Sequence, residues 1–320
     1  VNEFELIRTY FARQPVTRAD VRLGIGDDAA VLAPPLGHEL VVTTDLLVSG
    51  VHFLPDVDPA ALGHKALAVN LSDLAAMGAE PAWFLLNIAL PAVDEQWLAG
   101  FCDGLFALAR RYHVQLVGGD TSRAPQVAIA IEAHGFVPAG QALTRAGAKP
   151  GDRIFITGVL GDAGLALRHR QGRLKLSAAE LPSCVERMDR PPPRVEEGLA
   201  LRGIASSAID ISDGLVADFG HILERSNVGA KLDLGKFPLS AAYRAHLAEA
   251  GWDVVLANGD DYELCFTVPP GNLAALEKIK TRFPGITEIG LIESGSGLRI
   301  FDAAGKPYVP KTAGHDHFTE

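Results

Sequence analysis

The chain has 320 residues, of which 48% are hydrophobic and 21% charged, a composition typical of a globular protein. This length predicts about two domains of roughly 100–200 residues each. The formal net charge of −10 argues against a nucleic-acid-binding groove, which requires a basic patch, but it does not exclude a nucleotide bound through metal ions.

The cysteines and the apolar runs argue against several other classes of protein. Cys102, Cys184 and Cys265 are far apart and form no CxxC pair, so neither a disulfide framework nor a zinc site is predicted. Residues 4–11 place apolar side chains at helical spacing among charged ones, which predicts an amphipathic helix and not a signal peptide. No apolar run approaches the ~18 residues of a membrane span. We therefore expect a cytoplasmic protein that binds neither membranes nor nucleic acid.

The first half of the chain reads as alternating strands and helices. The expected elements are a strand at Leu40–Thr44, a helix at Pro59–Met77, a strand at Trp83–Leu90, a helix at Asp94–His113, and strands at Val114–Val117 and Val127–Val137. The polar stretch Pro138–Asp152, which contains Gly and Pro, then predicts a linker. We thus expect a first domain at residues 1–137.

The second half repeats the alternation after a strand at Arg153–Thr157. Further expected elements are helices at Asp162–His169, Gly214–Ser226, Ser240–Ala250 and Asn272–Arg282, and strands at Ser207–Ile211, Ala230–Leu234, Leu264–Val268, Ile286–Leu291 and Leu298–Phe301. The prediction is a second α/β domain at residues 153–320, and therefore a two-domain fold of the α/β class, with features of the α+β class.

Seven aspartates stand at the ends of apolar runs, beside small residues: Asp27, Asp28, Asp45, Asp73, Asp120, Asp210 and Asp213. Carboxylate oxygens are ligands that Mg²⁺ prefers, and Mg²⁺ usually enters a site together with substrate phosphates. Several of these aspartates are predicted at the C-terminal ends of strands, where sites in α/β proteins usually form. The pattern indicates a magnesium-dependent phosphate enzyme. Both halves contribute, so we expect the site in the cleft between the domains.

Each motif also has an alternative interpretation. Gly24–Ala29 matches the dinucleotide fingerprint G-x-G-x-x-A, but no convincing strand is predicted before it. Asp218–Gly220 spells DFG without the other protein-kinase motifs, and no P-loop occurs. Taken singly, Asp73 reads as a solvated helix residue, and Asp120 and Asp213 read as helix caps. The occurrence of all seven aspartates beside small residues favours a metal site over these separate interpretations.

Several motifs together resemble one enzyme family. They are GIGDDAAV, TTDLLVSGVHF, NLSDLAAMGAEP, VGGDTSR, LTRAGAKPGD, AIDISDGL and DDYELCFTV. From Phe4 to Phe318 the chain resembles the thiamine-monophosphate kinases, whose superfamily also contains aminoimidazole ribonucleotide synthetase and selenophosphate synthetase. The resemblance implies ATP-dependent phosphorylation of thiamine monophosphate to thiamine diphosphate. It also implies a homodimer, in which the N-terminal domains share a β-barrel and each C-terminal domain closes over the nucleotide.

The resemblance also implies roles for individual residues, none of them as a general base. Several Mg²⁺ ions would be held by Asp28, Thr43, Thr44, Asp45, Asp73, Asp120, Asp210 and Asp213. ATP would be contacted by Gly119, Asp120, Arg145 and Ser212, and thiamine monophosphate by His52, Asp260 and His315. Asp260 stands where relatives have glutamate, and His315 stands where they have an aromatic residue.

Rival interpretations remain within and outside the superfamily. A selenophosphate synthetase would need a reactive cysteine in an N-terminal loop, and this chain has none before Cys102. The related hydrogenase maturation factor needs a C-terminal cysteine, whereas this sequence ends in His317-Phe318-Thr319-Glu320. The alternatives that stay open are an enzyme like aminoimidazole ribonucleotide synthetase and a regulator that binds Mg-ATP without catalysis.

Overall fold

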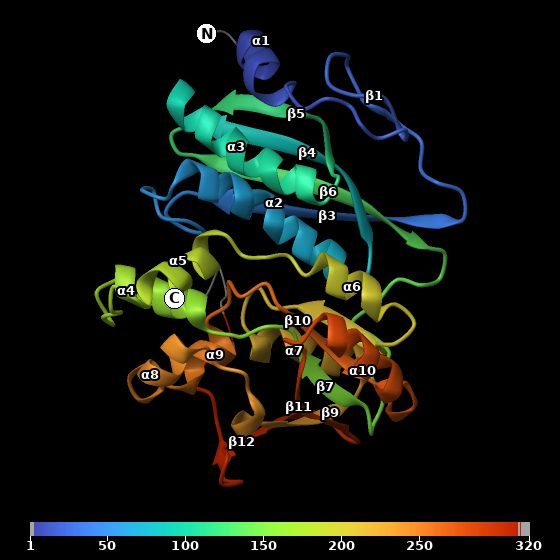
Figure 1. The fold of residues 1–320 in the computed structure, drawn as a ribbon, viewed down its shortest axis with the longest axis vertical. Coiled ribbons are helices and arrows are strands. Elements are labelled where there is room, and N and C mark those ends of the chain that lie inside the picture. Colours follow the sequence, from blue (N-terminus) through green and yellow to red (C-terminus); the bar gives the residue numbers. More distant parts are fainter. Residues whose placement is uncertain (1–2, 313, 315–320) are drawn as a thin grey trace. The chain divides into compact units, whose positions relative to one another are not determined.

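The structure is a computed structural model that describes residues 3–312 and residue 314 (Figure 1). The chain forms two compact units. The first comprises Val1–Leu74 with Ala79–Gly140, and the second comprises Ala75–Gly78 with Gln141–Glu320. Over the described residues, no helix is long and apolar enough to cross a membrane.

The first unit is built on a four-stranded sheet in the order β3-β6-β4-β5. Its elements are α1 (Glu3–Leu6), the π-helical segment η1 (Ile7–Phe11), β1 (Val21–Leu23), β2 (Val31–Leu32), β3 (His38–Val48), α2 (Pro59–Ala76), β4 (Glu80–Leu90), α3 (Glu95–Arg111), β5 (Gln115–Arg123) and β6 (Ala128–Pro138). Strands β4 and β5 are parallel, and the other pairs in this sheet are antiparallel.

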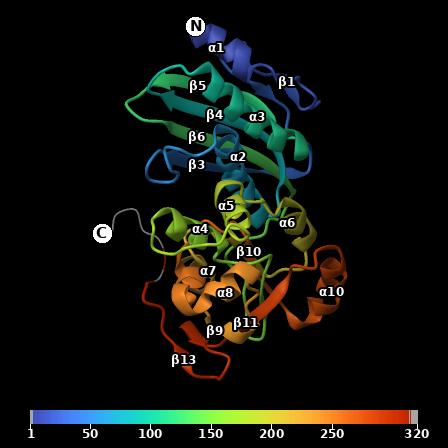
Figure 2. The ribbon, with the colours of Figure 1, turned by 60° about the vertical axis from the view of Figure 1, so that its left-hand side comes forward.

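Helices α2 and α3 cover one face of this sheet, as Figures 1 and 2 both show. The two helices approach so closely that only glycine fits at two contact points. A Cβ atom on Gly63 would lie 1.9 Å from the carbonyl oxygen of Phe101, and one on Gly104 would lie 1.8 Å from that of Ala60. This close packing fixes α2, which carries Asp73, against α3.

The second unit contains a seven-stranded sheet in the order β13-β12-β9-β11-β7-β10-β8. Its elements are β7 (Arg153–Ile156), α4 (Asp162–Arg170), α5 (Leu181–Asp189), α6 (Val195–Leu201), β8 (Ser207–Asp210), α7 (Leu215–Ser226), β9 (Gly229–Asp233), η2 (Leu234–Lys236), α8 (Ala241–Ala250), α9 (Trp252–Ala257), β10 (Leu264–Val268), η3 (Pro270–Asn272), α10 (Leu273–Arg282), β11 (Thr287–Glu293), β12 (Gly297–Phe301) and β13 (Pro307–Tyr308).

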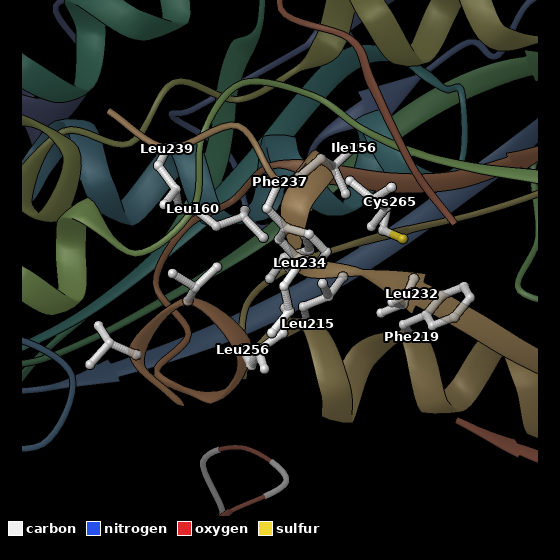
Figure 3. Close-up of a cluster of buried hydrophobic side chains, with 14 of the residues drawn as sticks. Ile156, Leu160, Leu215, Phe219, Leu232, Leu234, Phe237, Leu239, Leu256 and Cys265 are labelled. Atoms are coloured by element: carbon white, nitrogen blue, oxygen red, sulfur yellow. The ribbon is translucent and has the colours of Figure 1, made fainter. Parts of the chain in front are cut away.

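The core of this unit lies between α7 and the sheet. Phe219 and Leu215 of α7 pack with Ile156 of β7, Leu232 of β9 and Cys265 of β10 (Figure 3). All three cysteines of the chain are buried free thiols, in agreement with the absence of a predicted disulfide framework. Among the described residues, β9 and β12 are the only neighbouring strands of this sheet that run parallel, and the other pairs are antiparallel.

The antiparallel pairing corrects one sequence-based argument. Neighbouring antiparallel strands end at opposite edges of a sheet, so carboxylates that follow strands do not gather at one edge as they do in a parallel sheet. Asp210, the last residue of β8, is paired with Leu264, the first residue of β10. Two of the predicted strand ends are also wrong, because Asp45 lies inside β3 and Asp120 lies inside β5.

Most predicted helices and strands are present, with ends shifted by a few residues. The strand β1 corrects the expectation that none precedes Gly24–Ala29. However, β1 pairs with β2 in an antiparallel hairpin and no helix follows the glycines, so the dinucleotide-binding arrangement is absent from this described segment. Helices α5, α6 and α9 were not predicted, because each is short and two are flanked by Pro- or Gly-containing loops.

A buried ionic network links the loops of the second unit. The carboxylate of Glu263 has no exposed surface and accepts hydrogen bonds from Arg194 Nε and Nη2 and from Arg187 Nη2, each at 2.6 Å. The hydroxyl of Thr157 also donates to it, at 2.5 Å. Burial raises the pKa of Glu263, but Arg194 and Arg187 outweigh burial and hold this pKa below its ordinary value.

We predict that Glu263→Gln lowers the free energy of unfolding by about 3–5 kcal/mol, because the partly buried guanidinium groups of Arg187 and Arg194 lose their fully buried counter-charge. The folded-state pKa of Glu263 is depressed, so its contribution is fully present above the ordinary value of 4.5 and is lost as the pH falls through the folded-state pKa. Urea unfolding at pH 7 and at lower pH measures both effects.

The matched control is Glu277→Gln, which removes an exposed ion pair with Lys280. This variant should change the free energy of unfolding by less than about 1 kcal/mol. Equal unfolding midpoints for the two variants would contradict the stabilising role of the network.

Candidate functional site

A cavity of about 760 Å³ in the first unit brings two of the predicted segments together. Asp27 and Asp28 lie at its edge in an exposed loop, where the backbone N–H of Asp28 donates to Asp27 Oδ1 at 2.9 Å. Gly118 and Gly119 of β5 line the same cavity. The apolar part of the lining consists mainly of Ile7, Phe11, Ile25, Leu32, Leu85, Leu86, Leu116 and Val117.

The alternation of side chains along β3 divides its predicted ligands between the two faces of the sheet. Thr43 lies on the face covered by α2, and its hydroxyl donates a hydrogen bond to Asp73 Oδ2. Asp45, two residues further along, belongs to the same face. Thr44 belongs to the opposite face, and its hydroxyl donates to the carbonyl oxygen of Ile131 at 3.0 Å. Thr43, Asp45 and Asp73 are therefore neighbours, whereas Thr44 is separated from them by the strand.

Gly119 and Asp120 lie on β5 opposite Leu86 and Asn87 of β4. Gly119 has φ of 146°, and a Cβ atom there would lie 1.8 Å from the carbonyl oxygen of Leu86, so only glycine fits. Asp120 is exposed, and its Oδ2 accepts a hydrogen bond from the hydroxyl of Ser122 at 2.7 Å. A neutral donor thus holds this carboxylate in the middle of a strand.

His52 lies in the tight turn that follows β3. Its ring Nδ1 accepts a hydrogen bond from the backbone N–H of Val48 at 3.0 Å. The backbone N–H of His52 donates to the carbonyl oxygen of Val48 at 2.9 Å. Because Nδ1 accepts a proton donor, the neutral ring carries its proton on Nε2. His52 is therefore arranged as a hydrogen-bond donor through Nε2.

In the second unit, the end of β8 and the loop after it carry three of the predicted residues. Asp210 is buried, and Ser212 and Asp213 follow it before α7 begins. The backbone N–H groups of Ser212, Asp213 and Gly214 all donate to Oδ2 of Asp218, at 3.0, 3.0 and 3.1 Å. Burial, followed by the charge of Asp213, raises the pKa of Asp218 to about 7.

Asp260 lies against the same loop. Its backbone adopts φ of 65°, and its N–H donates to the carbonyl oxygen of Ser212 at 2.8 Å. The chain also returns here at Gly314, where a Cβ atom would lie 2.9 Å from the carbonyl oxygen of Asp213. The next predicted contact, His315, lies outside the described residues.

Arg145 does not lie near the loop of Ser212 and Asp213. Its carbonyl oxygen accepts a hydrogen bond from the hydroxyl of Ser226, the last residue of α7. Asp213 precedes the first turn of the same helix, and a helix of this length spans about 18 Å. Arg145, which is exposed, is therefore held at the opposite end of α7 from Ser212 and Asp213.

Comparisons with known proteins agree with the motifs. Residues 26–137 match the AIR synthase related protein, N-terminal domain, and residues 149–303 match the AIR synthase related protein, C-terminal domain. A thiamine-monophosphate kinase from Escherichia coli (strain K12) is 49% identical over 320 residues, covering 99% of this chain and 98% of the relative. This chain belongs to the thiamine-monophosphate kinase family. The thiamine-monophosphate kinase of Bacillus subtilis (strain 168) is 34% identical, covering 99% of this chain and all of the relative.

Solved structures of the family share the two-unit α/β fold. The thiamine-monophosphate kinase of Stenotrophomonas maltophilia K279a superposes with a TM-score of 0.87 at 46% identity, covering 96% of this chain and 98% of that one. A structure described as AaThiL complexed with AMPPCP and TMP has a TM-score of 0.77 at 32% identity, covering 91% and 92% of the two chains. The hydrogenase maturation protein HypE in complex with ATP, at 22% identity, shares the fold.

The donor atoms proposed for Mg²⁺ suit that ion, because all of them are carboxylate or hydroxyl oxygens. In the part of the chain that the structure describes, no three His, Cys, Asp or Glu side chains converge as a ready-made metal cluster. Mg²⁺ commonly keeps several waters and takes one or two carboxylates plus substrate phosphates, so it does not require such a cluster. The residues present therefore fit this ion.

Two further residues of the sites escaped the sequence analysis. His134 of β6 lines the cavity, and its Nδ1 is buried with no hydrogen-bond partner among the described residues. Asp218 organises the loop of Ser212 and Asp213, yet in the sequence it stood out only as part of an irrelevant DFG match. A carboxylate in the first turn of a helix after a glycine-containing loop is the signal that could have found it.

Proposed function

We propose that this chain transfers the γ-phosphate of ATP to thiamine monophosphate, which yields thiamine diphosphate. The support is family membership over essentially the whole chain, together with the relative described as complexed with AMPPCP and TMP. We further propose a cytoplasmic location. Incubation with Mg-ATP and thiamine monophosphate, followed by separation of the thiamine esters, tests the function. Formation of aminoimidazole ribonucleotide instead of thiamine diphosphate would contradict the proposed function and favour an enzyme like aminoimidazole ribonucleotide synthetase.

The proposed metal ligands are the carboxylates and hydroxyls of both units. They are Asp28, Thr43, Asp45, Asp73, Asp120, Asp210 and Asp213. Thr44 belongs to the proposed set only through its backbone, because its hydroxyl lies on the opposite face of β3 and donates to Ile131. Bound there, Mg²⁺ would offset the negative charge of the phosphate oxygens. Gly119, Asp120, Arg145 and Ser212 are proposed to contact ATP, and His52, Asp260 and His315 to contact thiamine monophosphate.

The acceptor explains why the site needs no strong base. The second pKa of a phosphate monoester is about 6, so the acceptor is already largely dianionic at neutral pH. The obstacle is repulsion between phosphates, because even one pair of unit charges about 4 Å apart costs about 4 kcal/mol at an effective dielectric constant of 20. The protein therefore has to position the two phosphates, and we propose direct in-line transfer without a phosphoenzyme.

The hydrogen bonds of His52 agree with this mechanism. The neutral ring carries its proton on Nε2, since Nδ1 accepts the N–H of Val48. Nε2 can then donate to a phosphate oxygen of the acceptor, but it cannot remove a proton from a hydroxyl acceptor in this state. We propose that His52 binds the substrate phosphate.

We predict that Asp45→Asn and Asp120→Asn each abolish phosphoryl transfer at saturating Mg²⁺, because each loses a metal-ligand charge. Both variants should fold, with unfolding free energies within about 1 kcal/mol of the wild type. The matched control is Asp103→Asn on α3, which loses only an exposed ion pair with Arg13. Near-normal turnover by Asp45→Asn or Asp120→Asn would remove that residue from the site.

We predict that thiamine monophosphate is a substrate and that free thiamine is not, because a hydroxyl acceptor lacks the phosphate and requires a base. His52→Asn should mainly raise KM for thiamine monophosphate, with a smaller effect on kcat. The matched control is His38→Asn at the exposed start of β3, whose kinetic constants should equal those of the wild type. Comparable turnover of free thiamine, or loss of kcat alone in His52→Asn, would favour a base-assisted mechanism.

We also propose that two copies join their N-terminal sheets in a shared barrel and that the C-terminal unit closes over the nucleotide. The support for the dimer is the face of the sheet opposite α2 and α3, along which β3 exposes a row of apolar side chains. Leu40, Val42 and Leu46 are 47%, 52% and 56% exposed. In the described residues the four strands form an open sheet, so a second copy is the partner that completes a barrel.

We predict a homodimer at micromolar concentration in analytical ultracentrifugation. Leu46→Glu should shift it to monomer, because a charge is placed in an apolar contact. Leu36→Glu is the control, since Leu36 is 97% exposed and precedes β3. A wild-type chain that sediments as a monomer would contradict the proposed barrel.

A further inference from the structure

Asp218 is a buried carboxylate that the proposed chemistry does not yet use. It is the fourth residue of α7 and only 4% exposed. Its Oδ2 accepts the N–H groups of Ser212, Asp213 and Gly214 at 3.0–3.1 Å. One oxygen therefore accepts three of the four backbone N–H groups of the loop that joins β8 to α7, and the fourth, that of Ile211, donates to the carbonyl oxygen of Glu263.

This arrangement differs from an ordinary helix cap. Successive backbone N–H groups that point to one spot form a concave anion site, which in many proteins takes a phosphate. Here a carboxylate of the same chain occupies that spot. Gly214, in the cap position of α7, has φ of 118° and provides no side-chain cap. Asp218 instead bonds back to the N–H groups that precede the helix, as the acidic residue of a capping box does.

The occupied amides restrict how Ser212 can act. Its N–H is taken by Asp218, and its carbonyl oxygen accepts the N–H of Asp260 at 2.8 Å. With its backbone N–H engaged by Asp218, the donor that Ser212 can offer to a nucleotide phosphate is its hydroxyl. The direction of that hydroxyl then depends on the backbone that Asp218 holds.

The loop is held on its other side by the segment before β10. A Cβ atom on Gly259 would lie 2.3 Å from the carbonyl oxygen of Ser212, so the two backbones are in direct contact. Gly214 is equally close to Ala257, because a Cβ atom there would lie 2.7 Å from the Cα of Ala257. The loop thus has close backbone contacts with the segment before β10, while its N–H groups are bonded to the carboxylate of Asp218.

We propose that Asp218 is a positioning residue for Mg-ATP, which fixes the Ser212 hydroxyl and the Asp213 carboxylate through the three N–H groups of their loop. The inference rests on the proposed function, because Ser212 and Asp213 have their roles only there. Asp218 itself touches neither nucleotide nor metal in this scheme. Its carboxylate acts on the reaction through the geometry of the loop.

The test compares Asp218→Ala with Asp218→Asn in the full chain. The alanine variant loses the acceptor of the three N–H groups. We expect kcat/KM for Mg-ATP to fall by about 10- to 100-fold, because small displacements of reacting groups cause losses of this size. The asparagine variant keeps an oxygen acceptor in place and should recover to within about fivefold of the wild type. KM for Mg-ATP should rise more than KM for thiamine monophosphate in Asp218→Ala.

The matched control is Asp233→Ala in the same unit. Asp233 also accepts a backbone N–H at the start of a helical turn, from Gly235 at 2.9 Å, but it lies outside the proposed site. This control should keep kcat/KM within about twofold of the wild type even if its melting temperature falls. A purely structural role for Asp218 predicts the same behaviour for Asp218→Ala, and that result would overturn the proposal.

If Asp218→Ala fails to fold, Asp218→Glu decides. It keeps the charge but moves the acceptor by one methylene, so KM for Mg-ATP should rise about fivefold or more; unchanged constants would refute the positioning role. Calorimetric titration with Mg-ATP gives a readout that is independent of turnover, and Asp218→Ala should weaken Kd about tenfold. A wild type that binds Mg-ATP without phosphorylating thiamine monophosphate refutes the proposed function, whereas equal Kd values refute the role of Asp218.

Discussion

A carboxylate can be fixed by neutral donors without losing its charge, and this constraint separates two groups of acidic residues in the structure. Asp73 and Asp120 accept hydrogen bonds from nearby hydroxyl groups. Glu263 is instead neutralised by two arginines and serves stability. Neutral donors set position and leave the negative charge available, which is what a site for cations and phosphates requires.

Helices and strands were largely predictable where the hydrophobic periodicity is strong. The fold was least predictable where it depends on which strands pair and in which direction they run. Helix Pro59–Ala76 and strand Leu264–Val268 match their predicted bounds within one residue. Strand direction was not predictable, because a run of apolar residues carries no information on whether its neighbour runs parallel or antiparallel. The hairpin of β1 and β2 also escaped prediction, since strands of two or three residues lack a measurable period.

The candidate site was predictable in its residue types and not in its geometry. The sequence motifs identified Asp45 and Asp120 as acids beside small residues, but both strands continue past them, because backbone pairing does not depend on the polarity of a side chain. Strand alternation places Thr43 and Thr44 on opposite faces, which already follows from the predicted strand Leu40–Thr44. That Asp45 shares the face of Thr43 is visible only once β3 is known to continue to Val48. Asp218 required the three-dimensional loop, since its partners precede it by four to six residues.

The backbone of the same loop favours aspartate over glutamate at position 260. Asp260 has φ of 65°, a conformation in which aspartate is several-fold enriched over most side chains because it is short and polar. Its N–H is tied to Ser212, so the backbone cannot relax to a more ordinary conformation without breaking that bond. Aspartate therefore reduces strain at this point, but it shortens the reach of the carboxylate by one methylene. The N–H of Asp260 donates to the Ser212 carbonyl oxygen and Asp218 accepts the Ser212 N–H, so the loop that Asp218 holds also fixes the backbone of Asp260, the residue that we propose contacts thiamine monophosphate.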